Sequence, residues 1–190
     1  MRRLAIGLLG LAALALAACG GGSSSDVQRA NRGEAPVRLA QRADCPRIGV
    51  LADAADLTRF TPGKGEDLTE MVVDARVSGV RGQCDLARAA VQVELAITLD
   101  ATRGPAAQGR VVDVPYFVVV TDADGEVLDK QVFQARFEFE SNRSRARLNE
   151  ESVKLMLPTA ANLRGSAYSV SIGLQVTEAE LAYNRRRGAR

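Results

Sequence analysis

The sequence contains no histidine and no tryptophan, and aromatic residues make up 4% of its 190 positions. Without histidine, Ser-His-Asp and Cys-His nucleophile pairs are excluded, together with every zinc or iron site that needs an imidazole ligand. The lack of tryptophan argues against a carbohydrate-stacking surface. No other pattern indicates a metal or a cofactor, so we expect neither, and we expect no enzyme activity.

Charge of one sign is not in excess either. The formal net charge of +2 comes from Arg2 and Arg3, which lie in a segment that we expect to be removed. Without these two, the 25 basic side chains fall to 23, which equals the number of acidic side chains. A balanced surface has no general attraction for nucleic acid. With 46% hydrophobic residues, the chain is long enough for one folded domain.

The first 18 residues predict a secretory signal peptide. Two arginines precede an apolar stretch of about 15 residues, which is shorter than the roughly 20 that a membrane-spanning helix needs. The stretch ends in Leu16-Ala17-Ala18-Cys19, which resembles the lipobox of bacterial lipoproteins. A plain signal peptide followed by an incidental cysteine is the alternative.

The lipobox resemblance implies that the chain is processed at Cys19. A diacylglycerol is joined to the Cys19 sulfur, the chain is cut before this residue, and in many Gram-negative bacteria an acyl chain such as palmitate is added to the new amino terminus. Two or three acyl chains anchor a protein stably to a membrane. Gly20 stands where an aspartate retains enterobacterial lipoproteins in the inner membrane, so we expect the outer membrane, facing the periplasm.

We divide the chain into a signal peptide at 1–18, a flexible tether at 19–44, a β-sandwich domain at 45–178 and a basic C-terminal tail at 179–190. The tether begins with three glycines and three serines, which no hydrophobic core can hold, and continues as a polar, arginine-rich stretch. The tail is expected to be either a short helix or frayed.

The three cysteines are an odd number for an exported protein until Cys19 is assigned to lipid. Cys45 and Cys84 then remain as one pair in an oxidising compartment, and we predict a disulfide between them. A redox-active or metal-binding thiol pair is the alternative, but the pair lacks the CxxC spacing that favours that role.

Period-two patterns dominate the chain after Cys45. They predict strands at 47–51, 71–80, 91–99, 111–121, 126–140, 152–157 and 168–176. The alternation is clearest from Val91 to Leu99, where every second residue is Val, Leu or Ile, as in a half-buried antiparallel strand.

Other local signals concern turns and breaks. Residues 53–67 are predicted to form a loop, and Gly79 and Gly82 to mark a turn between two strands. Pro115 indicates that part of its strand lies at a sheet edge. A short helix starting near Asn149 competes with the strand at 152–157.

About seven short strands without a long helix predict an all-β fold, an antiparallel β-sandwich. Leu157-Pro158, followed by Tyr168 at the opening of the next strand, resembles the E–F corner of fibronectin type III and immunoglobulin-like domains. The resemblance implies an immunoglobulin-like sandwich in which the Tyr168 hydroxyl bonds to upstream backbone.

Two short motifs have a functional and a local interpretation. Asp122-Ala123-Asp124-Gly125 begins like a calcium loop, but the later ligands are missing, and Asp-Gly is typical of a hairpin turn. Gly63-Lys64-Gly65 lacks the first glycine and the Ser or Thr of a phosphate-binding loop, so it predicts a loop only.

Arginines gather in two places where they could contact lipid phosphates, acidic headgroups or an acidic partner, although solvated loops explain them equally well. The two clusters are Arg143, Arg145 and Arg147, and Arg185, Arg186 and Arg187.

Two sets of side chains on the strand at 126–140 also have two interpretations. Phe133, Phe137 and Phe139 could line an apolar groove, but phenylalanines with period two are typical of a core. Glu138 and Glu140 share a face, which is the solvated one, so surface charge is favoured over a catalytic carboxylate pair.

The sequence therefore predicts a lipid-anchored, non-enzymatic module that contacts or scaffolds another protein of the cell envelope. It looks like the small β-domain lipoproteins of Gram-negative bacteria that have a lipobox and a Gly/Ser leash. The alternative is a carrier that holds a lipid or hydrophobic peptide between its sheets. Such a carrier requires an apolar cavity of roughly several hundred cubic ångströms.

Overall fold

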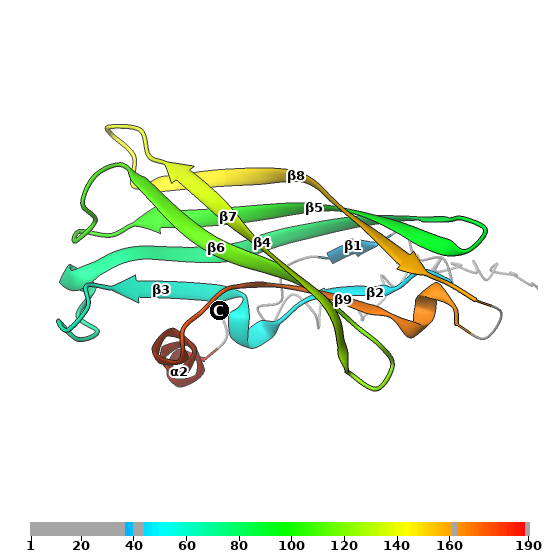
Figure 1. The fold of residues 1–190 in the computed structure, drawn as a ribbon. Helices are drawn as coiled ribbons and strands as arrows, with labels where there is room; N and C mark the ends of the chain where they lie inside the picture. Colours follow the sequence, from blue (N-terminus) through cyan, green and yellow to red (C-terminus); the bar gives the residue numbers. More distant parts are fainter. Residues whose placement is uncertain (1–36, 40–43, 161–162, 189–190) are drawn as a thin grey trace, which may run out of the picture.

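The structure, a computed structural model, describes residues 37–39, 44–160 and 163–188. In this part of the chain, nine strands form two sheets that face each other (Figure 1). Sheet A contains β1 (Val37–Leu39), β3 (Asp56–Phe60), β4 (Met71–Leu86), β5 (Ala90–Arg103) and β8 (Arg145–Pro158). Sheet B contains β2 (Arg47–Val50), β6 (Val111–Thr121), β7 (Val127–Glu138) and β9 (Ser169–Leu174). The prediction of an all-β sandwich is confirmed.

The chain passes between the two sheets several times. In sheet A the order is β1-β4-β5-β8, with β3 also paired to β4, and in sheet B it is β2-β9-β6-β7. β4 and β5 form one antiparallel hairpin and β6 and β7 another, while the connections from β5 to β6, β7 to β8 and β8 to β9 cross between sheets. β2 runs parallel to β9, so the first strand of sheet B lies beside its last.

The core lies between the sheets, where the alternating residues of both inner faces meet. On β5 every second residue from Val91 to Leu99 is at most 1% exposed, whereas Gln92 and Glu94 face solvent, as predicted. Ala135 and Phe137 of β7 meet them from sheet B and are also buried. Full burial of one Val, Leu or Ile side chain contributes roughly 1.5–3 kcal/mol, so this interior is the main source of stability.

The predicted turn between β6 and β7 is confirmed. The Asp122 carboxylate accepts hydrogen bonds from the backbone N–H groups of Asp124 and Glu126, at 3.0 and 2.8 Å. Gly125 has a φ of 85°, which a side chain would make unfavourable. The Asp-Gly sequence is therefore explained by the turn.

Pro115 lies where β6 pairs with β7 alone, as its lack of an N–H group suggested. The ladder between β6 and β9 ends at Tyr116, and the Pro115 carbonyl instead accepts from the Gln175 N–H at 2.8 Å. Beyond that point β6 is internal, because β9 covers its other side.

The prediction of a loop at 53–67 is wrong in its first half. A 3-10 helix, η1 (Ala52–Ala54), leads into β3, which pairs antiparallel with β4. The alternation of this short strand was concealed because both of its faces are covered, so that Asp56, Leu57 and Thr58 are all buried.

The turn predicted at Gly79 and Gly82 is also wrong, since both glycines lie inside the 16-residue strand β4. The register between β4 and β5 shifts between Val77 and Gly79, which marks a β-bulge at Ser78. A glycine beside a bulge interrupts the pattern without ending the strand.

No helix forms near Asn149. β8 begins at Arg145 and pairs with β5 through Leu148 and Asn149, so the strand predicted at 152–157 starts earlier than expected. The start of β8 has too few apolar residues to predict a strand, because only one residue in two faces the core.

Both ends of the described chain contribute elements to the fold. Val37–Leu39, within the segment predicted as tether, forms the three-residue strand β1, parallel to β4. The segment predicted as a tail contains the helix α2 (Glu178–Arg187), which lies beside β3 (Figure 1). Of the two forms expected for the tail, the helix is the one observed.

Candidate functional site

The predicted lipidation site, Cys19, lies outside the described residues, as do the signal peptide and most of the tether. In the described part of the chain, no helix has both the length and the apolar character needed to cross a membrane.

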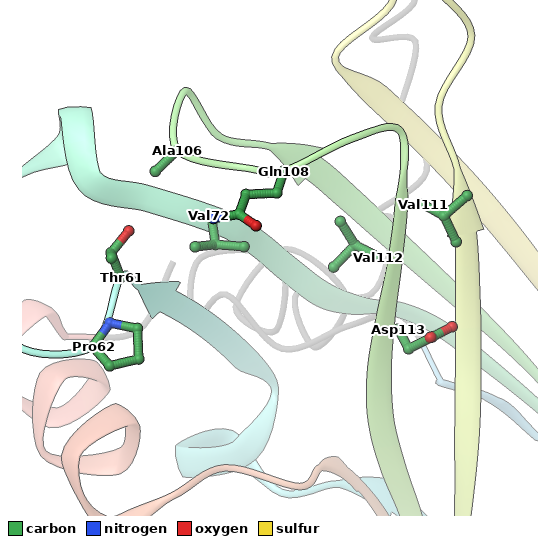
Figure 2. Close-up of a pocket in the computed structure, with 8 residues that line it drawn as sticks. All are labelled: Thr61, Pro62, Val72, Ala106, Gln108, Val111, Val112 and Asp113. Carbon is green, nitrogen blue, oxygen red and sulfur yellow. The ribbon is translucent and has the colours of Figure 1, made fainter.

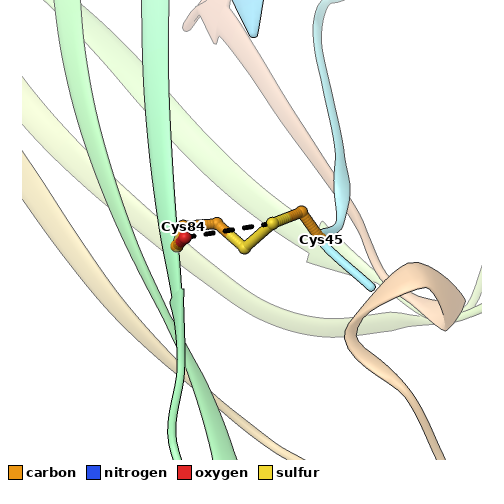
Figure 3. The surroundings of a disulfide bond; sticks show 2 residues. All are labelled: Cys45 and Cys84. Carbon is orange, nitrogen blue, oxygen red and sulfur yellow. Dashed lines mark hydrogen bonds between the residues drawn. A yellow bond between two sulfur atoms is a disulfide. The ribbon is translucent and has the colours of Figure 1, made fainter. Parts of the chain in front are cut away.

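Cys45 and Cys84 form a disulfide, as the sequence predicted (Figure 3). Cys45 precedes β2 of sheet B and Cys84 lies near the end of β4 in sheet A, with the two Cα atoms 6.0 Å apart. The bridge joins the two sheets at one end of the sandwich. It closes a loop with a sequence separation of 39 residues.

Two arginines of the first cluster form ion pairs, one within sheet A and one in the loop between β7 and β8. Arg147 makes a two-pronged ion pair with Asp100 on β5, at 2.6 and 3.0 Å, and Arg143 lies 3.1 Å from Glu140. The Arg147 guanidinium lowers the pKa of the Asp100 carboxyl through these hydrogen bonds. Arg145 is exposed at the start of β8.

The second arginine cluster fixes α2 to the sandwich. Arg185 pairs with Asp53 at 2.8 Å, Arg186 with Glu66, and Arg187 with Asp74 at 3.4 Å. These acidic residues precede the helix by more than one hundred positions, so the sequence pattern could not reveal the pairs. This cluster, for which the sequence allowed either a binding site or a solvated tail, is held by acidic groups of the same chain.

A buried polar network lies between α2 and the outer surface of β3 and β4. The Arg187 guanidinium donates to the Thr58 hydroxyl at 3.0 Å, and this hydroxyl donates to the Asp74 carboxylate at 2.8 Å. Asp56 is 4% exposed and lies 3.5 Å from the Arg76 guanidinium. In this network each carboxylate lies beside a guanidinium group, and buried ionic groups need such pairing.

Asn184 of α2 caps the edge of β3. Asn184 is 8% exposed. Its amide donates to the carbonyl oxygens of Asp56 and Asp53, at 2.6 and 3.1 Å. Glu180, on the same helix, pairs with Arg59 at 3.0 Å. These contacts satisfy polar groups of an edge strand, so the network has a structural role.

Sequence patterns do not point to these network residues, because β3 lacks the alternation that predicts a strand. One signal was present: Thr177 and Glu180 form a capping box, in which each side chain bonds to the backbone N–H of the other residue. The pattern Thr-x-x-Glu is typical of a helix start and would have favoured a helix at the carboxyl end.

A pocket of about 360 Å³ opens at the opposite end of the sandwich from the disulfide (Figure 2). It forms where β9 has ended and the first residues of β6 face the start of β4 without a covering strand. Asp113, its one charged lining residue, lies 3.5 Å from Arg136. The lining residues are Thr61, Pro62, Val72, Ala106, Gln108, Val111, Val112 and Asp113.

The other sequence candidates have ordinary structural positions. Phe137 and Phe139 are buried in the core, and Phe133 is half-buried and stacks on Tyr116. Glu138 faces solvent 3.8 Å from Arg136.

The loop at Gly63-Lys64-Gly65 contains two glycines with positive φ, as expected for a turn. No group of three or more Cys, Asp or Glu side chains in the described ranges could hold a metal ion.

Tyr168 provides a further long-range contact. Its side chain is 4% exposed, and its hydroxyl donates to the Pro158 carbonyl oxygen at 2.7 Å. The bond ties the start of β9 to the end of β8 across the turn between them.

The fold thus defines an all-β sandwich with two facing sheets, a disulfide across one end and a helix against one edge. Comparison with known proteins finds no matching family model, no matching curated protein and no matching solved structure.

Proposed function

We propose that this chain is a cell-envelope lipoprotein, anchored through lipid on Cys19, whose β-domain is a non-enzymatic interaction module. The observation that carries the proposal is the leader, in which Leu16-Ala17-Ala18-Cys19 ends an apolar stretch and a Gly/Ser run follows. Because such a run does not pack into a core, it leaves the domain free to reach a partner near the membrane.

The strand order supports an immunoglobulin-like type for the sandwich. β4, β5 and β8 occupy the places of strands A, B and E, and β6, β7 and β9 those of C, C′ and F. β2 occupies the place of strand G beside F, but it runs parallel to β9, where G is antiparallel.

Tyr168 adds to the likeness, because it stands at the start of the F-like strand and bonds to backbone at the end of the E-like strand. The disulfide differs, since it joins the region before β2 to β4 rather than the B and F positions.

An interaction role is supported by how the charged groups are used. Arg147, Arg185 and Arg187 are bound to carboxylates of the same chain, so they hold strands and α2 in place. The sheet edges and loops then remain as the surfaces for a partner, which is usual for a sandwich. Anchoring raises the local concentration of the module at the membrane and strengthens weak contacts there.

The anchor is tested with the full chain and its Cys19→Ser variant, expressed in a Gram-negative host. We expect the wild-type chain to sediment with outer membranes and to exceed the mass of residues 19–190 by its acyl chains. The Cys19→Ser protein should carry no acyl chains and should be absent from the outer membrane fraction. If that variant still sediments with membranes and the wild-type mass shows no added lipid, the proposal is wrong.

The partner is tested by crosslinking the anchored protein in its native envelope, with the Cys19→Ser variant as the matched control. We expect a reproducible envelope protein that is captured by the anchored form and lost from the control. Capture that is equal with both forms would show that anchoring does not contribute to the contact.

The pocket favours a second candidate function, a carrier of a lipid or hydrophobic peptide. Its volume of about 360 Å³ and the side chains of Val72 and Val112 suit a small apolar group. Native mass spectrometry of the protein purified from membranes tests this function, with Val112→Trp as a variant that fills the pocket. A bound lipid that is lost on filling supports the carrier, and its absence from the wild type rejects it.

A further inference from the structure

β7, a strand of 12 residues, lies at one edge of sheet B. β7 ends the order β2-β9-β6-β7, and no described strand pairs with its far side. A long edge of this kind presents unpaired backbone groups that can accept another strand.

The backbone groups that face this edge belong to the even-numbered residues of β7. The Phe139 N–H donates to the Arg110 carbonyl, so odd-numbered positions bond toward β6. Gln134 stands opposite Pro115, whose carbonyl is turned away to Gln175. In an antiparallel ladder the two kinds of position alternate, so Gln134 and its even-numbered neighbours direct N–H and C=O outward.

The side chains of the same residues are exposed on the outer face of sheet B. Lys130 lies 4.6 Å from the Phe117 ring, and Arg136 lies between Asp113 and Glu138. Val132 is 53% exposed although it is apolar. The edge therefore carries both signs of charge and an uncovered apolar residue.

We propose that β7 pairs antiparallel with β7 of a second copy of the chain, about a two-fold axis at Gln134. In this register Lys130 faces Glu138 of the second copy, and Val132 faces the aliphatic part of Arg136. The symmetry makes each contact twice, and the two four-stranded sheets become one continuous sheet.

The charges select this register over its neighbours. Sliding one strand by two residues in one direction places Lys130 opposite Arg136 twice, and like charges directly opposite are destabilising. A further slide in that direction places Lys130 opposite Gln134 and forms no ion pair. Sliding in the other direction places Lys130 opposite Glu140, which lies beyond the end of β7 at Glu138. The arrangement with Lys130 opposite Glu138 makes two pairs of opposite charge.

The inner face is also improved by this pairing. Phe133, which is half-buried at the edge, is placed opposite Ala135 of the second copy. Its exposed part is then covered by a neighbouring strand. Because a two-fold pairing closes the edge, the association ends at a dimer.

The test uses the processed chain, residues 19–190, carrying Cys19→Ser, so that neither acyl chains nor the apolar leader can drive association, and its outcome is independent of the proposed anchor. Sedimentation velocity over a concentration series should give a dimer. Lys130→Glu should raise the dimer dissociation constant by at least about tenfold, because two attractions become repulsions. Lys130→Glu/Glu138→Lys should restore it to within about threefold.

Gln134→Pro gives an independent test of the backbone pairing. It removes the N–H at the axis but no bond to β6, so we expect a folded monomer with an unchanged circular dichroism spectrum. The proposal is overturned by a wild-type monomer at all concentrations, or by a dimer that is insensitive to Lys130→Glu and Gln134→Pro. Failure of the charge-swapped double variant to restore the dimer overturns the register.

Discussion

Two edges of the sandwich, β3 in sheet A and β7 in sheet B, are finished in opposite ways. The β3 edge is covered by α2, whose Asn184 bonds to the carbonyls of Asp53 and Asp56. The β7 edge has no described neighbour, and its even-numbered side chains face solvent. A covered edge cannot accept another strand, whereas an open one can. The proposed pairing accordingly uses the β7 edge and not the β3 edge.

We expect the β3 and β7 edges to unfold as one cooperative unit, and removal of the disulfide should give the largest loss of stability. For Cys45→Ser/Cys84→Ser we expect a loss of about 4 kcal/mol in the free energy of unfolding, because the bridge restricts a long loop in the unfolded chain. Urea unfolding should give one transition in both far- and near-ultraviolet circular dichroism. Two separated transitions would show that the edges unfold independently.

A matched pair of alanine variants sharpens the comparison directly. Asn184→Ala leaves two backbone carbonyls beneath α2 without their donor, so we expect a loss of about 2 kcal/mol. Gln134→Ala on the open edge should stay within about 0.5 kcal/mol of the wild type in the monomer. Urea midpoints measure both. Equal effects would mean that the covered edge gains nothing from Asn184.

The start of α2 gives a smaller effect. Thr177→Ala removes the side chain that accepts from the Glu180 N–H, and we expect a loss of about 1 kcal/mol. Thr177→Ser keeps the hydroxyl and is the control, with a near wild-type thermal midpoint. Amide exchange should become faster in β3 and unchanged in β7. Faster exchange in β7 would contradict the separation of the two edges.

The smallest effect concerns the exposed pair of Asp100 on β5 and Arg147 on β8. The guanidinium lowers the pKa of Asp100, so its stabilisation is present above the ordinary carboxyl pKa and is lost as pH falls through the lowered value. The urea midpoint of the wild type should therefore exceed that of Asp100→Asn slightly at neutral pH. The difference should vanish in acid, and a constant difference would exclude this cause.

Strands with one buried and one solvated face could be predicted from the sequence. β5 and β7 alternate between apolar and polar residues, and Asp122 to Gly125 marks the turn before β7. β3 could not be predicted, because its polar residues Asp56 and Thr58 are buried under α2. Alternation reports burial only where the second face meets water.

The candidate sites divide in the same way. The pairing of Cys45 with Cys84 followed from their number once Cys19 was assigned, and the structure contains it. The partners of Arg185, Arg186 and Arg187 did not follow from any local pattern. The pocket could not be predicted either, because it depends on β9 ending before the first residues of β6.

Local chemistry by itself determined the apolar leader ending at Cys19, the hairpin turn and the strands with one wet face, because each depends on residues adjacent in the chain. Only the tertiary structure decided which strands share a sheet, which carboxylates hold the arginines, and which edge is covered. Those outcomes require segments more than one hundred residues apart to meet, as α2 and β3 do, and nothing in either segment alone specifies the other.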